Sequence, residues 1–135
     1  DPARYQEILK QEQETGQWAE KLEFDLFGVD HKSMGGELFR SWNFPDTLID
    51  TALEHDNLNI TSPHKSLIIF VTLAGLLADR LGYGAFSPPK KTLLETLLPY
   101  TDLSREDIEA YGETYLTKLA GDSFYRECQE LFNLD

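Results

Sequence analysis

The sequence predicts an all-α fold, a compact bundle of several helices within one domain spanning residues 1–135. Three observations predict it. Apolar residues recur at helical spacing, no stretch keeps the alternation of a β-strand, and Gly, Pro, Asn and Asp cluster between the periodic segments. A chain of 135 residues suits a single domain with a buried core.

We expect four helices in the first half of the chain. A polar first helix starts at Pro2 and ends near Gly16, and a second covers about 17–27 and stops at Gly28. Asp30 then caps a third helix, which ends before the turn 43–45. A fourth helix, capped by Asp46, runs to about residue 55.

The most apolar helix comes next. Ser62 and Pro63 supply its N-cap and first residue, and Gly82 closes it. Because this segment is apolar nearly all round, we expect other helices to cover it on several sides. A short helix around 92–98 follows. Ser104 and Asp107 form a capping box for a helix to about residue 120, and a last helix ends near residue 132.

Composition excludes several classes of function. The chain has 24 acidic and 12 basic side chains, a formal net charge of -12, which opposes binding to nucleic acid. Its longest apolar stretch, 67–78, is shorter than the ~20 residues of a membrane span, so we expect no membrane insertion. A single cysteine cannot form a disulfide within the chain and suits a reducing compartment, which predicts a cytoplasmic protein.

Two histidines and one carboxylate are the candidate site residues. His31 shares its helical face with Met34 and Leu38, so we expect it to face inward. His55 is turned inward by its spacing from earlier apolar residues, and Asp56 follows it. These side chains could form part of a Zn, Fe or Mn site, or the histidines could hydrogen-bond each other or the backbone.

Three smaller predictions concern packing and exposure. Gly35 and Gly36 stand in mid-helix, where glycine is unfavourable, which indicates close helix packing. His64, near the start of the apolar helix, is predicted to be exposed. Four acidic side chains of the first two helices are predicted to be solvated: Glu12, Glu14, Glu20 and Glu23.

The run 23–31, EFDLFGVDH, followed by Gly35, Leu38 and the turn from Trp42 to Pro45, strongly resembles the HDOD domain. That domain is a helical signalling relative of the HD-type metal phosphohydrolases. Residues 54–56, 71–74 and 97–108 are also similar, so the resemblance covers nearly the whole chain. We identify the match with the C-terminal part of the domain, and the helix carrying the family's namesake His-Asp pair would then lie upstream.

The resemblance also implies a degenerate metal site. His31 and His55 match metal-ligand positions of active relatives, the cyclic-dinucleotide phosphodiesterases called HD-GYP. Asp56 stands where those relatives usually have a second histidine, and Gly75 stands where they have an aspartate ligand. The expected site is therefore His31, His55 and Asp56 as remnant positions, with no metal, no cofactor and no catalytic residue.

The function that the resemblance implies is a non-catalytic regulatory module, which binds a signalling protein in a bacterial pathway. The alternative is a metal-dependent phosphohydrolase acting on a nucleotide or cyclic dinucleotide, with its missing ligands supplied from outside this chain. A third hypothesis is that exposed faces of the peripheral helices mediate homo-oligomerisation.

Overall fold

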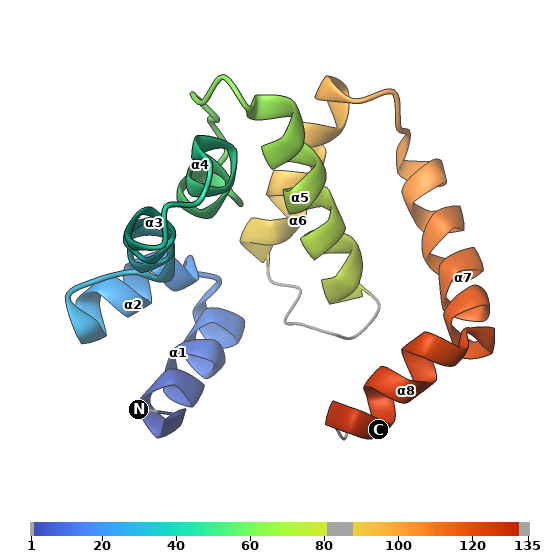
Figure 1. The fold of residues 1–135 in the computed structure, drawn as a ribbon, viewed down its shortest axis with the longest axis horizontal. Coiled ribbons are helices and arrows are strands. Elements are labelled where there is room, and N and C mark those ends of the chain that lie inside the picture. Colours follow the sequence, from blue (N-terminus) through green and yellow to red (C-terminus); the bar gives the residue numbers. More distant parts are fainter. Residues whose placement is uncertain (1, 81–87, 133–135) are drawn as a thin grey trace. The chain divides into compact units, whose positions relative to one another are not determined.

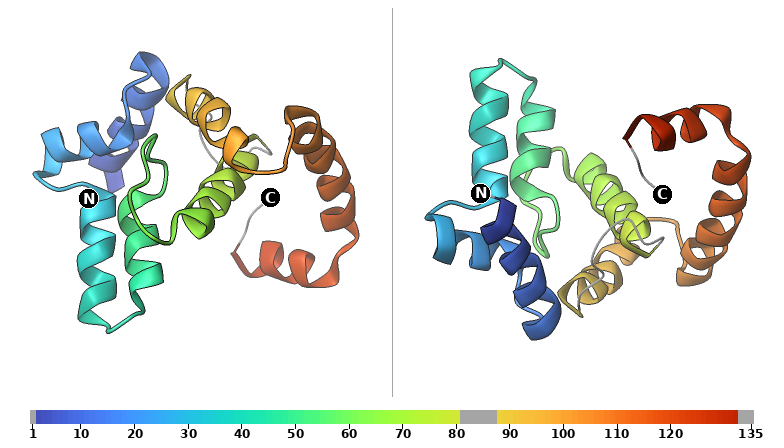
Figure 2. Two further views of the ribbon diagram at one scale, coloured as in Figure 1. Left: turned by 90° about the horizontal axis from the view of Figure 1, so that it is seen from above. Right: turned by 90° about the horizontal axis from the view of Figure 1, so that it is seen from below.

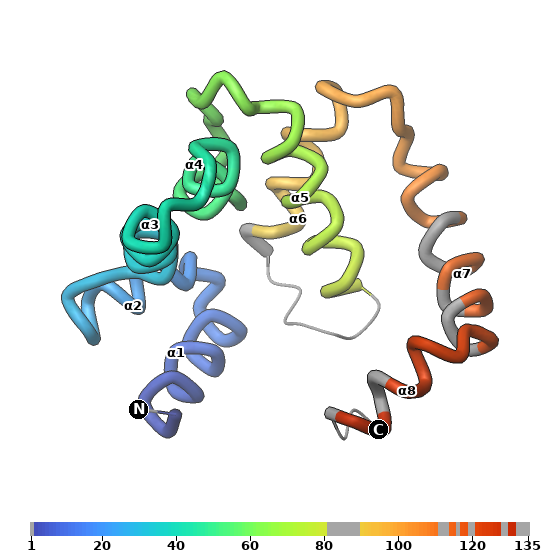
Figure 3. Tube along the Cα trace, viewed as in Figure 1, coloured from blue at the N-terminus to red at the C-terminus, as the bar shows by residue number. Residues whose placement is uncertain are grey.

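The computed structural model describes residues 2–80 and 88–132, and within those residues every regular element is a helix and none is a strand (Figure 1). The prediction of an all-α fold is confirmed. The chain divides into two compact units, Asp1–Thr101 and Asp102–Asp135, which are described separately below. Figure 3 traces the chain from blue at the N-terminus to red at the C-terminus. The expectation of one domain over residues 1–135 stays a prediction.

The first unit contains six α-helices and a closing 3-10 turn. Their order follows the sequence prediction, with boundaries shifted by a few residues. They are α1 (Pro2–Thr15), α2 (Ala19–Phe27), α3 (His31–Ser41), α4 (Asp46–Glu54), α5 (Lys65–Ala78), α6 (Pro88–Leu97) and η2 (Leu98–Tyr100).

Helices α3 and α4 lie side by side, joined by a tight turn (Figure 2). The two glycines of α3 face α4. A Cβ atom at Gly36 would lie 2.5 Å from Leu53 Cδ2, whereas one at Gly35 would lie 3.6 Å from Ala52 Cβ, an ordinary contact. Gly36 therefore permits an approach that any side chain would obstruct, which confirms the prediction of close helix packing.

Local capping fixes the start of α3. The Asp30 carboxylate accepts hydrogen bonds from the Ser33 backbone N–H at 2.7 Å and from the Ser33 hydroxyl at 3.0 Å. Just before it, Gly28 ends α2 in the left-handed conformation, with φ of 75°, which glycine adopts without strain. Both predicted boundary residues are confirmed, and together they place His31 at the first turn of α3.

Helix α5 forms the centre of the main hydrophobic core, but its prediction was wrong in two respects. It begins at Lys65 with His64 as N-cap residue, because the Ser62 hydroxyl accepts the His64 backbone N–H at 2.9 Å in a turn before the helix. Only one face is buried, since Leu67, Phe70 and Val71 are exposed. The predicted end at Gly82 lies outside the described residues. The core cluster consists of Ile60, Ile68, Ile69, Leu73, Leu76, Leu93, Leu94 and Leu97.

The second unit contains α7 (Arg105–Gly121) and α8 (Ser123–Phe132). The predicted capping box opens α7: the Ser104 N–H donates to Asp107 Oδ2 at 2.8 Å, and the Asp107 N–H donates to Ser104 Oγ at 3.0 Å. Helix α8 exposes Phe124 and Leu131. Across both described stretches of the chain, none of the helices combines the length and apolar character needed to cross a membrane.

Candidate functional site

The two candidate histidines contact each other. His31 lies in the first turn of α3 and His55 directly follows α4, so the packing of these helices brings the rings together. Their Nε2 atoms are 3.3 Å apart. The prediction that His31 faces inward was wrong, because its side chain is 39% exposed and its neighbours Met34 and Leu38 on the same face are also exposed.

Both histidines use Nδ1 to hold their rings in place. His55 Nδ1 lies 3.1 Å from the Thr51 carbonyl oxygen and 2.9 Å from that of Ala52, and since carbonyls only accept, this nitrogen carries a hydrogen. His31 Nδ1 lies 2.6 Å from Glu23 Oε2 and donates to that carboxylate. The two Nε2 atoms therefore face each other, and the pair links the start of α3 to the end of α4.

Glu23 is the anchor of this arrangement, and the prediction that it is solvated was wrong. The residue is only 2% exposed. Its carboxylate accepts the His31 backbone N–H at 2.9 Å and the Tyr5 hydroxyl at 3.2 Å, in addition to the His31 ring. A buried carboxylate needs such partners because desolvation is costly. Glu23 follows the buried Leu22 and precedes Leu26 at helical spacing, a signal that it lies on the inner face of α2.

A pocket of about 650 Å³ opens beside the pair, and we call it the His31 pocket. Its walls are largely apolar. Burial and the nearby Glu23 raise the pKa of the Tyr5 hydroxyl at its edge. The lining residues are Pro2, Tyr5, Glu23, Phe27, Val29, Asp30, His31 and Met34.

The remaining predicted site residues do not join the histidines. Asp56 has a left-handed backbone, with φ of 62°, and its N–H donates to the Thr72 hydroxyl at 3.0 Å. Its side chain lines a different pocket, described below. Gly75 has no side chain to contribute, and Asp79, one turn further along, is held by Lys90 at 2.9 Å.

The residues present do not make a complete metal site. Two Nε2 atoms 3.3 Å apart could serve as neighbouring ligands of a tetrahedral ion, for which a Zn–N distance of about 2.0–2.1 Å implies a similar separation. Within residues 2–80 and 88–132, however, no group of three or more His, Cys, Asp or Glu side chains is placed to hold an ion. Further ligands of such an ion would have to come from outside the described residues.

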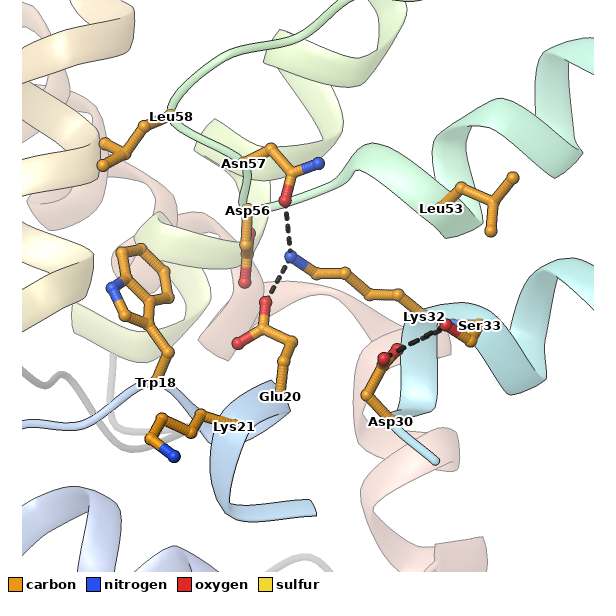
Figure 4. A pocket seen from close by; sticks show the side chains of 10 residues that line it. All are labelled: Trp18, Glu20, Lys21, Asp30, Lys32, Ser33, Leu53, Asp56, Asn57 and Leu58. Atoms are coloured by element: carbon orange, nitrogen blue, oxygen red, sulfur yellow. Dashed lines mark hydrogen bonds and ion pairs between the residues drawn. The ribbon is translucent and has the colours of Figure 1, made fainter. Parts of the chain in front are cut away.

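The second pocket, about 440 Å³ in volume, lies between α2, the start of α3 and the segment after α4, and we call it the Trp18 pocket (Figure 4). Buried Lys32 crosses it, contacting Glu20 Oε1 and donating to Asn57 Oδ1 at 3.0 Å. Burial raises the pKa of Glu20, but the bond from Lys32, a backbone hydrogen bond and the nearby positive charge together outweigh it and leave the pKa lowered. The lining residues are Trp18, Glu20, Lys21, Asp30, Lys32, Ser33, Leu53, Asp56, Asn57 and Leu58.

Two other acidic groups also differ from the sequence prediction. Glu12, predicted to be solvated, is buried on the same side of α1 as Ile8. Glu20, also predicted to be solvated, is only partly exposed, because it contacts Lys32. Glu14, by contrast, is exposed as predicted.

A Ser-Asp-His cluster occurs where α4 meets the start of α5, but its geometry is that of a cap. Asp50 Oδ2 accepts the Ser62 hydroxyl at 2.7 Å and His64 Nδ1 at 3.0 Å. His64 Nδ1 also lies 3.5 Å from Ser62 Oγ, but it donates its hydrogen to Asp50, so the imidazole is not arranged to take the hydroxyl proton as in a Ser-His-Asp triad. These bonds leave His64 only partly exposed, which corrects its predicted exposure. The Ser62 and His64 bonds lower the pKa of Asp50.

Comparison with known proteins finds a match to one family. The family model of the HDOD domain matches residues 1–58, which contain the histidine pair, Glu23 and every residue named above as lining the two pockets. This stretch is similar to an HD-related signalling domain. The match covers the N-terminal part of the chain, so the resemblance expected over nearly its whole length, and its assignment to the C-terminal part of the domain, are not supported. No curated protein and no solved structure matches the chain.

Proposed function

We propose that this chain is a non-catalytic regulatory module that binds a signalling protein in a bacterial cytoplasmic pathway. The observation that carries the proposal is an exposed apolar face on α3, formed by Met34, Leu38 and Trp42. They are 57%, 42% and 58% exposed. Because they are spaced four residues apart, all three lie on one side of the helix. This face begins at Met34, which lines the His31 pocket, and ends at the turn before α4.

A contiguous group of exposed apolar side chains favours binding of another molecule. Leaving them in water forgoes about 25 cal/mol per Å² of apolar surface that a partner could bury. The neighbouring Phe44 is also exposed and meets the Trp42 ring edge-on, with ring centroids 5.9 Å apart, so it extends the same surface into the turn. A protein partner covering this surface would recover that free energy, which supports binding as the role of the face.

Two further observations support a role without catalysis. The HDOD match to residues 1–58 relates this surface to a signalling family. In addition, both ring nitrogens of His31 are engaged, Nδ1 with Glu23 and Nε2 with His55, so the pair is arranged as an internal hydrogen-bonded bridge between α2, α3 and α4. A bridge of this kind stabilises the helices that present the α3 face.

The proposal is tested by quantitative affinity capture from the source cell with the immobilised chain and two matched variants. Met34→Glu places a charge in the α3 face, and Phe124→Glu places the same charge at another exposed apolar position, on α8. A partner retained by the parent and by Phe124→Glu but lost with Met34→Glu supports the proposal. Equal retention by all three, or none by the parent, contradicts it.

The phosphohydrolase alternative has one specific observation in its favour, the separation of 3.3 Å between the two Nε2 atoms. It requires ligands from outside the described residues. Homo-oligomerisation through the same α3 face is the other outcome to be distinguished. Sedimentation equilibrium of the parent and of Met34→Glu does so, because a self-associating face would give a parent mass that exceeds 15.5 kDa and falls with the substitution.

A further inference from the structure

The Trp18 pocket combines features that neither the family match nor the α3 face explains. An indole ring forms one wall, and the carboxylates of Glu20 and Asp56 lie across from it (Figure 4). Trp18 is partly buried and packs against the main core, which holds its ring in place. The pocket is thus a preformed hollow with an aromatic wall and an acidic wall.

The charges around the hollow leave it acidic. Three carboxylates, those of Glu20, Asp30 and Asp56, line it with two ammonium groups. Lys32 and Glu20 neutralise each other, and the Asp30 carboxylate accepts two hydrogen bonds from Ser33, so Asp56 is the carboxylate whose charge remains. The other ammonium group, that of Lys21, is paired outside the pocket with Asp25 at 2.8 Å.

Asp56 is the carboxylate best placed to meet a ligand. Its backbone N–H donates to Thr72, its backbone is left-handed, and its side chain lines the pocket (Figure 4). The charge of Lys90 acts on Asp56, but Lys90 makes its direct ion pair with Asp79, at 2.9 Å. The Asp56 carboxylate therefore retains capacity to accept hydrogen bonds.

The chemistry of these walls selects a planar cation. A guanidinium group stacks on an indole face and donates two parallel hydrogen bonds to a carboxylate at its edge. The net charge of -12 over the whole chain favours the approach of a basic segment. We propose that the Trp18 pocket binds an arginine side chain from a basic segment of the partner protein, a proposal that rests on the proposed function and specifies the chemistry of the partner.

The test uses the full chain and three acetylated peptides of alternating glycine and arginine, glycine and lysine, or glycine and citrulline. Citrulline keeps the shape of arginine without its charge. Binding is followed by Trp18 fluorescence in a Trp42→Phe background, which removes the second tryptophan, and by calorimetry. We expect the arginine peptide to bind at least about tenfold more tightly than the citrulline peptide, and more weakly as salt rises.

Matched variants test whether the arginine peptide binds in the Trp18 pocket. Asp56→Asn removes the charge, and asparagine accepts the left-handed backbone, so the fold should persist. Glu14→Gln removes the same charge at an exposed position of α1 that does not line the pocket. We expect about tenfold weaker arginine binding for Asp56→Asn and little change for Glu14→Gln. Trp18→Phe keeps an aromatic ring in the pocket wall, so we expect it to weaken binding of the arginine peptide less than Asp56→Asn does.

Two outcomes would overturn the inference: equal affinity for the arginine and citrulline peptides, or equal affinity of the parent and Asp56→Asn for the arginine peptide. Tighter binding of lysine than of arginine would also overturn it, since an ammonium group does not use the planar geometry. The proposed function is tested separately by partner capture through the α3 face. If that capture persists while the arginine peptide fails to bind, only the pocket assignment is wrong.

Discussion

Replacing Gly36 by alanine tests the packing that brings the two histidines together. The substitution adds one methyl group to the contact between α3 and α4. An ideal Cβ there would lie 2.5 Å from Leu53 Cδ2 and 2.8 Å from Leu53 Cγ. Distances this short require Leu53 to change rotamer or the helices to separate.

The magnitude follows from two opposing effects. Inserting a methyl group into a well-packed contact costs about 1–3 kcal/mol. Replacing glycine by alanine within a helix gains roughly 0.5–1 kcal/mol. We therefore expect Gly36→Ala to lower the free energy of unfolding by about 1–2 kcal/mol. Gly35→Ala, whose Cβ would meet Ala52 Cβ at 3.6 Å, should instead raise it by roughly 0.5–1 kcal/mol.

The assay is urea unfolding followed by far-ultraviolet circular dichroism, for both alanine variants and for each in a Leu53→Ala background. Truncating Leu53 removes the atoms that the new methyl would meet, so Gly36→Ala should become neutral or stabilising there. Opposite signs for the two glycines, together with this rescue, support the packing. Equal effects at Gly35 and Gly36, or no rescue, would refute the reasoning.

Three further predictions address the core, the buried carboxylate and pH. Leu73→Asp should destabilise the first unit by roughly 3 kcal/mol or more, because it buries an uncompensated charge; a variant that melts like the parent would rule out the core assignment. Glu23→Gln should cost about 1–3 kcal/mol and shift the His31 ring resonances in NMR spectra, since the ring loses a charged acceptor; an unchanged His31 spectrum would contradict the bridge. Burial and Glu23 raise the pKa of Tyr5, so its contribution to folding stability is complete below its unfolded pKa and is lost as pH rises above about 10. The pKa of Asp50 is lowered, so its contribution to folding stability is present at neutral pH and is lost as pH falls below about 4. Thermal melts across pH should show both losses, with Tyr5→Phe flattening the alkaline one and Asp50→Asn the acid one; unchanged profiles in the two variants would exclude these groups as the source.

Features of the fold that depend on local sequence could be predicted well. Asp30 caps α3 and Ser104 with Asp107 opens α7, because a cap joins residues only three positions apart. The glycine pair of α3 was equally informative, since glycine in mid-helix is unfavourable without a packing reason.

Features that depend on the arrangement of whole helices could not be predicted in the same way. Apolar spacing identifies a face of α3, but whether Met34 is buried depends on which helices cover that face, and none does so fully. Glu23 was missed because a charged residue is solvated by default, and its burial follows only once α1 and α3 supply Tyr5 and His31. The contact of His31 with His55 likewise joins residues 24 positions apart.

We propose that the His31–His55 pair supports a binding module and is not a catalytic metal centre. The most direct measurement is turnover of cyclic dinucleotides and generic phosphodiesters by the purified chain loaded in turn with Mn²⁺, Fe²⁺ and Zn²⁺, with bound metal determined on the same samples. We predict substoichiometric metal and no hydrolysis above the metal-only control. Stoichiometric metal together with hydrolysis that is abolished by His31→Ala and by His55→Ala would contradict the account.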